Sequence, residues 1–166
     1  RCCPRMDRDL FVRGDGVLVE IAWLETLDLE TCLQHLRAEQ VGRLAVVVDD
    51  GYPIVLPVNY RLVEASGLTW VALRTRPGNV IDQASINVAF EIDGIERARR
   101  RGWSVLVRGV LQRVDPDAAD FRERFDAQPW LASERDVWLI IEPFAITGRE
   151  LHPAEHDWAF HVSAYL

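Results

Sequence analysis

Six apolar segments, separated by short polar turns, dominate the pattern along the chain. They cover residues 42–48, 54–63, 68–75, 87–93, 103–114 and 136–151. Segments rich in Val, Ile and aromatic residues between turn signals are typical of β-strands. Mostly antiparallel strands with short turns lose their free edges when the sheet closes on itself. The pattern therefore predicts a mainly β protein, a six-stranded and mostly antiparallel barrel with flanking helices.

A helical pattern precedes these strands. Apolar residues recur at a spacing of three and four over 29–36, which predicts an amphipathic helix that begins after Asp28 and is stopped by Gly42. Two shorter helices are predicted in the connections between strands. One is 77–85, which begins with a proline, and the other is 115–125, which begins with a capping aspartate.

Two prolines interrupt the predicted strands. Pro57 lies within 54–63 and Pro143 lies within 136–151. Because proline has no N–H to give to a ladder, we expect Pro57 at a strand edge or bulge, where a ligand often approaches. We expect the last strand to bend at Pro143.

The length of 166 residues suits one domain. Residues 1–16 are charged and interrupted by glycine, and we expect them to form a flexible arm. Residues 17–151 form the predicted barrel domain, within which 17–25 is apolar enough for a strand or for docking onto the domain. Residues 152–166 are apolar at intervals, and we expect this tail to pack on the domain or on a partner subunit.

Composition excludes several classes of function. The net charge of −7 argues against a protein that binds nucleic acid or an anionic membrane, and no apolar segment approaches the ~20 residues of a membrane span. All 19 basic residues are arginine, so a lysine Schiff base with pyridoxal phosphate is impossible. Three cysteines do not make a disulfide framework, and we expect a reduced, cytoplasmic protein.

The segment 73–80 carries the strongest candidate for anion binding. Arg74, Thr75 and Arg76 come directly before the predicted helix at Pro77. Backbone N–H groups at a helix N-terminus bind phosphate well. An ordinary turn with solvated arginines is the alternative, and the residues alone leave both open.

The other candidate motifs are weaker indications of a functional site. His152, Glu155 and His156 match the spacing of a zinc motif, but that motif needs a long helix, and Pro153 interrupts it. We therefore expect no metal site. The basic run 97–101 is expected to be a solvated hairpin tip rather than an anion grip. No Ser-His-Asp or Cys-His arrangement can be argued.

Beyond these patterns, the chain resembles a known family. GRLAVVV, PVNY, LRT-x-x-G, VAFEID, GWSVLVRG and PFAITGR occur in the same order as in the pyridoxamine 5′-phosphate oxidase-like, FMN-binding split-barrel proteins, over about residues 29–151. The short members common in actinobacteria are the most similar. The resemblance implies a homodimeric split barrel with two flavins at the dimer interface, and FMN is the first ligand expected.

The resemblance also implies which residues contact the flavin. The ring and the ribityl chain would lie along one strand, the phosphate on the turn after the next strand, and a partner-facing strand would complete the site. By position, these residues are Pro57, Val58, Asn59, Tyr60, Arg74, Thr75, Arg76, Gly78, Asn79, Val80, Trp103 and Ser104.

One position departs from the family pattern. The family has a lysine on the flavin phosphate where this chain has Val80. Loss of such a charge-assisted contact removes about 1.5–3 kcal/mol, and Arg74 or Arg76 is the expected compensation. The basic C-terminal motif of a true pyridoxamine phosphate oxidase is also absent, so that reaction is not predicted.

The function predicted from the resemblance is an FMN-dependent oxidoreductase acting on a small-molecule redox substrate. Hydride transfer at the flavin requires no acid or base from the protein, so no catalytic residue is assigned. One alternative is a deazaflavin-dependent reductase of a quinone, enone or similar acceptor, with the deazaflavin held by 97–101. The other is a non-enzymatic flavin- or haem-binding protein, or a dimer without a cofactor.

Overall fold

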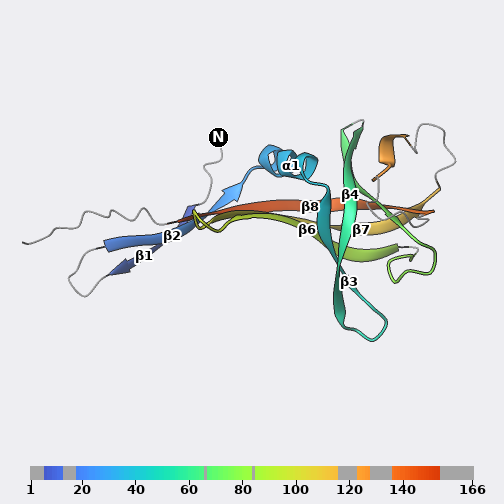
Figure 1. The fold of residues 1–166 in the computed structure, drawn as a ribbon, viewed down its shortest axis with the longest axis horizontal. Helices are drawn as coiled ribbons and strands as arrows, with labels where there is room; N and C mark the ends of the chain where they lie inside the picture. Colours follow the sequence, from blue (N-terminus) through green and yellow to red (C-terminus); the bar gives the residue numbers. More distant parts are fainter. Residues whose placement is uncertain are drawn as a thin grey trace, which may run out of the picture.

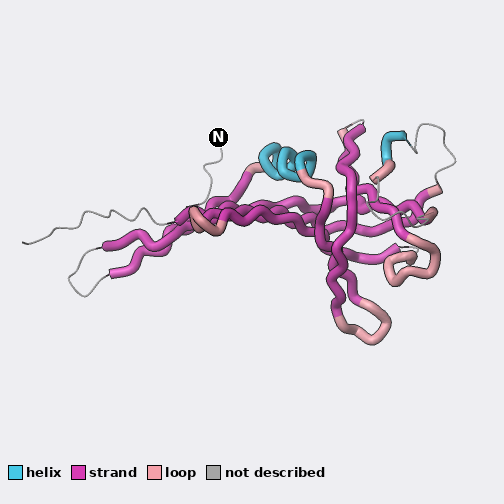
Figure 2. The backbone as a smooth tube through the Cα atoms, viewed as in Figure 1, coloured by secondary structure: helices cyan, strands magenta, loops and turns pink. Residues whose placement is uncertain are grey.

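The computed structural model describes residues 6–12, 18–65, 67–83, 85–115, 123–127 and 136–153, with side chains from Trp23 onward. All strands in these ranges belong to one antiparallel sheet (Figures 1 and 2). The elements are β1 (Met6–Val12), β2 (Leu18–Leu27), α1 (Leu29–Ala38), β3 (Val41–Val47), β4 (Pro53–Ala65), β5 (Leu68–Thr75), β6 (Ser85–Glu96), β7 (Arg101–Val114) and β8 (Val137–Pro153).

Six of the eight strands close into a ring. They lie in the order β8-β5-β4-β3-β6-β7, and β7 pairs with β8 to complete the barrel. The mainly β barrel is therefore confirmed, but the sheet has eight strands instead of six. The two additional strands are the β1–β2 hairpin, which pairs through Ala22–Leu27 with the far end of β8. Residues 6–12 of the expected arm are thus a strand.

The barrel is split along β4, which changes partner at its middle. Residues 53–59 pair with β3 and residues 60–65 pair with β5. The β3–β4 hairpin therefore projects from the barrel (Figure 1). Pro57 lies in the half of β4 that has no partner on the β5 side, so its missing N–H breaks no ladder there. This is the edge position expected for it.

The middle of β8 is irregular where a bend was expected. Arg108 of β7 pairs with Ala145, but the next residue pairs with Pro143. Phe144 is left between them as a bulge, with 65% of its surface exposed. A bulge of this kind bends the strand and increases its twist.

The barrel interior is filled by side chains at alternating positions of the strands. They include Leu44, Val46, Val71, Leu73, Phe90, Ile92, Val105, Val107, Leu111, Leu139 and Ile141. Gly42 lies in β3 and is not the end of the helix. A Cβ at this position would be 2.2 Å from the Phe90 ring, so the ring requires glycine on the neighbouring strand.

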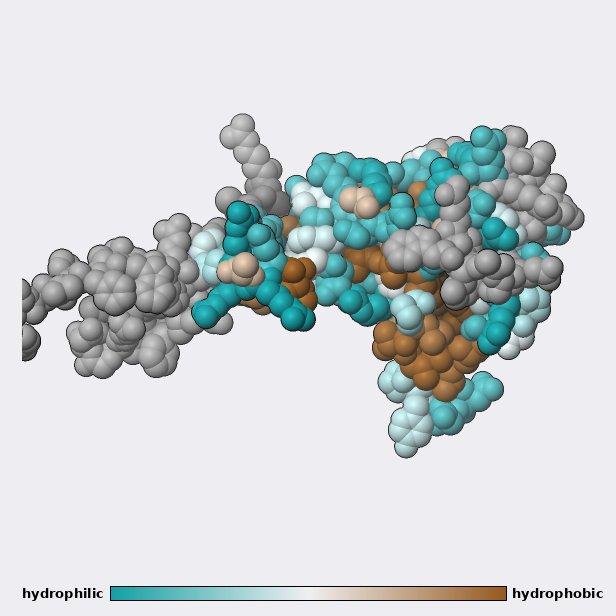
Figure 3. Space-filling view, in the orientation of Figure 1, coloured by the Kyte–Doolittle hydropathy of each residue, from teal (hydrophilic) through white to brown (hydrophobic). Residues whose placement is uncertain are grey.

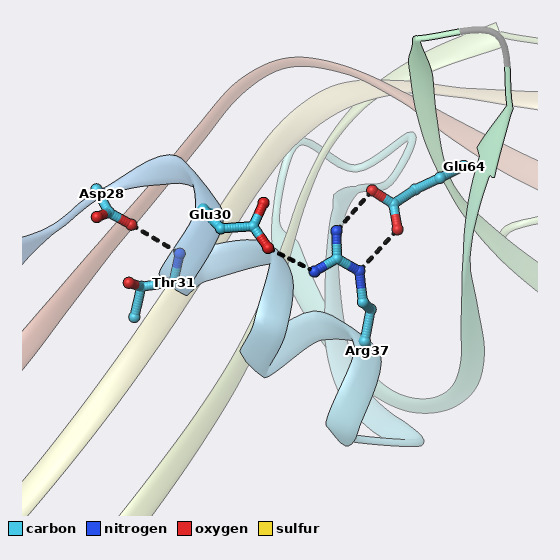
Figure 4. Close-up of polar contacts among 5 residues, drawn as sticks. All are labelled: Asp28, Glu30, Thr31, Arg37 and Glu64. Carbon is cyan, nitrogen blue, oxygen red and sulfur yellow. Dashed lines mark hydrogen bonds and ion pairs between the residues drawn. The ribbon is translucent and has the colours of Figure 1, made fainter.

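The helix α1 is fixed at both ends by polar contacts (Figure 4). The N–H of Thr31 donates to the Asp28 carboxylate at 2.7 Å, and this hydrogen bond lowers the pKa of Asp28. Near the other end, Arg37 donates to both oxygens of Glu64 on β4, at 2.7 and 2.9 Å, and to Glu30 at 2.9 Å. Arg37 lowers the pKa of Glu64. The buried residues Cys32, Leu33 and Leu36 face the barrel.

The two short helices predicted in the connections are not found as predicted. Residues 77–83 form turns, and within 115–125 the described helical residues are only 123–125. Residues 116–122 lie outside the described ranges, as do 154–166 of the expected tail, while His152 and Pro153 continue β8. No helix in the described ranges is long and apolar enough to cross a membrane.

Candidate functional site

Most of the residues implied by the resemblance gather where β4 and β5 diverge. The ladder between these strands ends at the pair Tyr60 and Leu73. Pro57–Asn59 leave this point on β4, and Arg74 and Thr75 leave it on β5. The two segments implied to hold the ring and the phosphate of a flavin therefore lie side by side at this point.

Tyr60 is part of the core. Tyr60 is 2% exposed, and its hydroxyl donates to the Leu36 carbonyl at 2.9 Å. Its ring packs edge-on against the Phe90 ring, with the ring centroids 4.8 Å apart. Burial raises the pKa of the phenol. The ring and the hydroxyl are thus engaged inside the barrel.

Thr75 and Arg74 end β5 in different surroundings. Thr75 is 1% exposed, and its hydroxyl makes no hydrogen bond with the residues that the structure describes. Arg74 is held by the Asp126 carboxylate at 3.1 Å and lies 4.6 Å over the Trp138 ring. Arg76 follows and is exposed. Arg74 is therefore already paired with a carboxylate.

The expected phosphate loop is a tight turn and not the start of a helix. Gly78 has φ +72°, a left-handed conformation that favours glycine. Its N–H donates to the Asp82 carboxylate at 3.0 Å, and the Asn79 side chain accepts from the N–H of Ile81 at 3.2 Å. Ile81 is buried and fixes the loop to the barrel. The left-handed glycine and these side-chain bonds replace the predicted helical turn.

Two residues of this region were missed by the sequence reasoning. Asp82 holds the Gly78 N–H with one oxygen and Arg113 with the other, at 3.1 Å. Arg113 belongs to β7 and is remote from the loop in the sequence. An aspartate four residues after the turn glycine was a signal for the first contact, but no local pattern points to the second.

Trp103 and Ser104 lie at the other end of β8. Thr75 pairs with Val137, and Ser104 pairs with Arg149, twelve residues further along the same strand. At about 3.3 Å per residue, that is roughly 40 Å of strand. The Trp103 ring stacks on His35 of α1, with ring centroids 3.8 Å apart. One chain therefore does not bring Trp103 and Ser104 to the loop.

A pocket of about 460 Å³ opens beside Tyr60, between the end of α1, β4 and residues 123–127. Its size suits a small ligand. Its two arginines are already engaged, because Arg37 is paired with Glu64 and Arg61 donates to the Glu123 carbonyl at 3.0 Å. The pocket shares only Tyr60 with the residues implied to bind a flavin.

The remaining charged or titratable candidates are held by hydrogen bonds or ion pairs. His152 lies 3.0 Å from Glu25, and Arg101 lies 2.7 Å from Glu150. The ligand atoms of the histidine and the two glutamates are within 4.8 Å of one another, and Arg101 balances part of their charge. Glu155 and His156 of the zinc-like motif lie outside the described residues. The arginines of 97–101 are exposed around a hairpin turn, as expected.

Comparison with known proteins places the chain among related structures. A family model described as pyridoxamine 5′-phosphate oxidase matches residues 28–150. The structure of an FAD binding protein from Mycobacterium smegmatis is 33% identical, with a TM-score of 0.62, over 76% of this chain and 98% of that one. An FAD-binding protein from Mesorhizobium loti is 25% identical, with a TM-score of 0.61, over 77% and 96%.

An uncharacterized protein of Mycobacterium tuberculosis is 29% identical over 126 residues, which is 74% of this chain and 82% of that protein. The family match extends from the start of α1 to the end of the barrel, and it includes every strand of the closed ring. The chain therefore belongs to the pyridoxamine 5′-phosphate oxidase-like family.

Proposed function

We propose that this protein is a flavin-dependent oxidoreductase that acts as a homodimer, with FMN as its first expected ligand. The observation that carries the proposal is the division of the implied flavin contacts between the two ends of β8. A second copy of the chain supplies Trp103 and Ser104 to the loop and to Pro57–Asn59 of the first. Family membership supports the same arrangement.

The loop after β5 suits a ribityl phosphate. Thr75 offers a buried hydroxyl that has no partner among the described residues. Among those residues, apart from Gly78 and its chain neighbours, no heavy atom lies within 4 Å of the position of a Cβ on Gly78. Close approach of a ligand to that backbone is therefore unobstructed. A bound flavin would supply the hydride-accepting ring, and the residues of this chain would supply position and charge.

FAD is the second candidate ligand. Two similar structures, 33% and 25% identical, are of FAD-binding proteins. FMN and FAD share the ribityl phosphate, but in FAD this phosphate is part of a diphosphate. A loop without a lysine at position 80 has less charge to offer a terminal phosphate, and this observation supports FAD as the second candidate beside FMN.

The projecting hairpin supports the homodimer. Val47, Tyr52 and Val55 are 62%, 71% and 61% exposed, and Figure 3 shows apolar surface gathered over β3 and β4. An apolar patch of this kind marks an interaction surface. A second copy that covers it buries the patch and brings two barrels together.

The test is an absorbance spectrum of freshly purified protein, with its mass in solution measured by light scattering. We expect flavin absorbance and twice the mass of one chain. Thermal shifts with FMN, FAD and a deazaflavin then rank the ligands. Colourless protein that is stabilised by none of the three contradicts the proposal, and a larger shift with the deazaflavin favours the reductase alternative.

A further inference from the structure

Position 80 leaves the proposed phosphate site without the family's lysine. Val80 is 37% exposed and uncharged. Arg74, one expected compensation, is held by Asp126 and Trp138 on the other side of the β5 end. Arg76, the other, belongs to the exposed part of the turn. Neither guanidinium is therefore fixed to the loop by a contact among the described residues.

Arg113 reaches this loop from a different strand. It pairs with Leu139 on β8, and Leu139 pairs with Leu73 on β5, so Arg113 lies at the end of the barrel where β5 enters the turn. Its guanidinium donates to the Asp82 carboxylate at 3.1 Å. A cation is thus fixed to the loop that the resemblance implies for the phosphate.

Asp82 makes this placement rigid. Its side chain is only 10% exposed, and its second oxygen accepts the N–H of Gly78 at 3.0 Å. The contact to Asp82 uses one of the five N–H donors of the Arg113 guanidinium. Because the Arg113 side chain is 58% exposed, further donors face solvent beside the turn.

We propose that Arg113 is the phosphate anchor of this protein, that it replaces the family's lysine, and that Asp82 positions it. The inference rests on the proposed function and names the residue that holds the ribityl phosphate of FMN or FAD. Arginine suits this task because its planar fork binds phosphate oxygens in pairs and stays charged. No covalent step is involved.

The test measures binding of riboflavin, FMN and FAD by quenching of flavin fluorescence. Riboflavin lacks the phosphate, so the ratio of its Kd to that of FMN isolates the phosphate contact. We expect Arg113→Gln to lower this ratio by roughly tenfold without changing the riboflavin Kd. Arg108→Gln, which removes another exposed arginine of β7 away from the turn, should leave the ratio unchanged.

A rescue variant sharpens the result. Adding Val80→Lys to Arg113→Gln should restore the ratio, because it returns a cation to the position that the family uses. The inference fails if Arg113→Gln leaves the ratio unchanged, if Arg108→Gln lowers it equally, or if only FAD binding weakens. Unaltered riboflavin affinity shows that the variant is folded. If the wild-type protein binds none of the three flavins, the proposed function itself fails.

Discussion

The two ends of β8 carry the two halves of the proposed flavin site, and they are built differently. At the end near Val137, one chain brings Thr75, Gly78, Asp82 and Arg113 together through hydrogen bonds and strand register. At the far end, Trp103 stacks on His35 and has no phosphate loop beside it. One half is assembled within the chain, whereas in the proposed homodimer the other half comes from a second copy.

The largest effect is expected from the core that both halves share. Phe90 is fully buried, and Phe90→Ala should destabilise the protein by about 3–5 kcal/mol. Urea unfolding followed by far-UV circular dichroism measures the change. Leu68→Ala, at the exposed start of β5, is the matched control and should change the free energy of unfolding little. Equal losses of unfolding free energy in both variants would mean that the barrel core around Phe90 does not stabilise the two halves of the site.

The second prediction separates the two halves. Trp103→Ala should weaken FMN and riboflavin binding equally, by roughly tenfold, because it removes an aromatic contact and no phosphate contact. Arg113→Gln should weaken the binding of FMN and leave that of riboflavin unchanged. Mixed dimers of the two variants should regain one intact site of two, seen as half the flavin per dimer. Mixed dimers that bind no better than either variant would refute a site shared between copies.

The third prediction concerns a residue that the family resemblance assigned to the ligand. Tyr60→Phe removes the hydroxyl that donates to the Leu36 carbonyl and leaves this buried acceptor without a partner. We expect a loss of about 1–2 kcal/mol in unfolding free energy and an unchanged flavin Kd. A tenfold change in Kd with normal stability would reverse this assignment.

The smallest effect is expected at the N-terminus of α1, the helix that carries His35. The folded-state pKa of Asp28 is lowered because its carboxylate accepts the N–H of Thr31. Its stabilisation is therefore full above the unfolded pKa of about 3.9 and is lost as the pH falls through the lower folded value.

Melting temperatures of the wild type and of Asp28→Ala, compared from neutral to acidic pH, test this contribution. The difference should disappear in acid. Asp28→Asn keeps a capping side chain that does not titrate, and its difference from Asp28→Ala should stay constant with pH. A wild-type advantage that persists at the acid end would contradict the assignment.

The strands were predictable because their signal is local. Residues 68–75 were expected as a strand and form β5 over the same residues, since apolar residues between turn signals mark both ends. The strand Met6–Val12 was not predicted, because the charged residues Asp7, Arg8 and Asp9 interrupt its apolar pattern and its pairing with β2 is not a local signal. The order of the strands follows from contacts that no local pattern records.

The site was predictable only in part for the same reason. The turn after Thr75 was expected at the right residues but as the start of a helix. It is not helical, because the hydrogen bond from the Gly78 N–H to Asp82 competes with the helical conformation. The family motif implies that Tyr60 contacts the ligand. In the structure its hydroxyl donates to the Leu36 carbonyl and its ring packs against Phe90 in the core. Arg113 lies on a strand that meets the loop only through the closed barrel.

The change of partner within β4 has a kinetic consequence. Residues 53–59 are held only by β3 in the projecting hairpin, whereas residues 60–65 are held by β5 in the closed ring. Amide hydrogens exchange at rates set by the unit that must open to expose them. In hydrogen–deuterium exchange, β4 should therefore divide between Asn59 and Tyr60 into a fast and a slow half. Association of a second copy on the hairpin should slow the first half and leave the other unchanged.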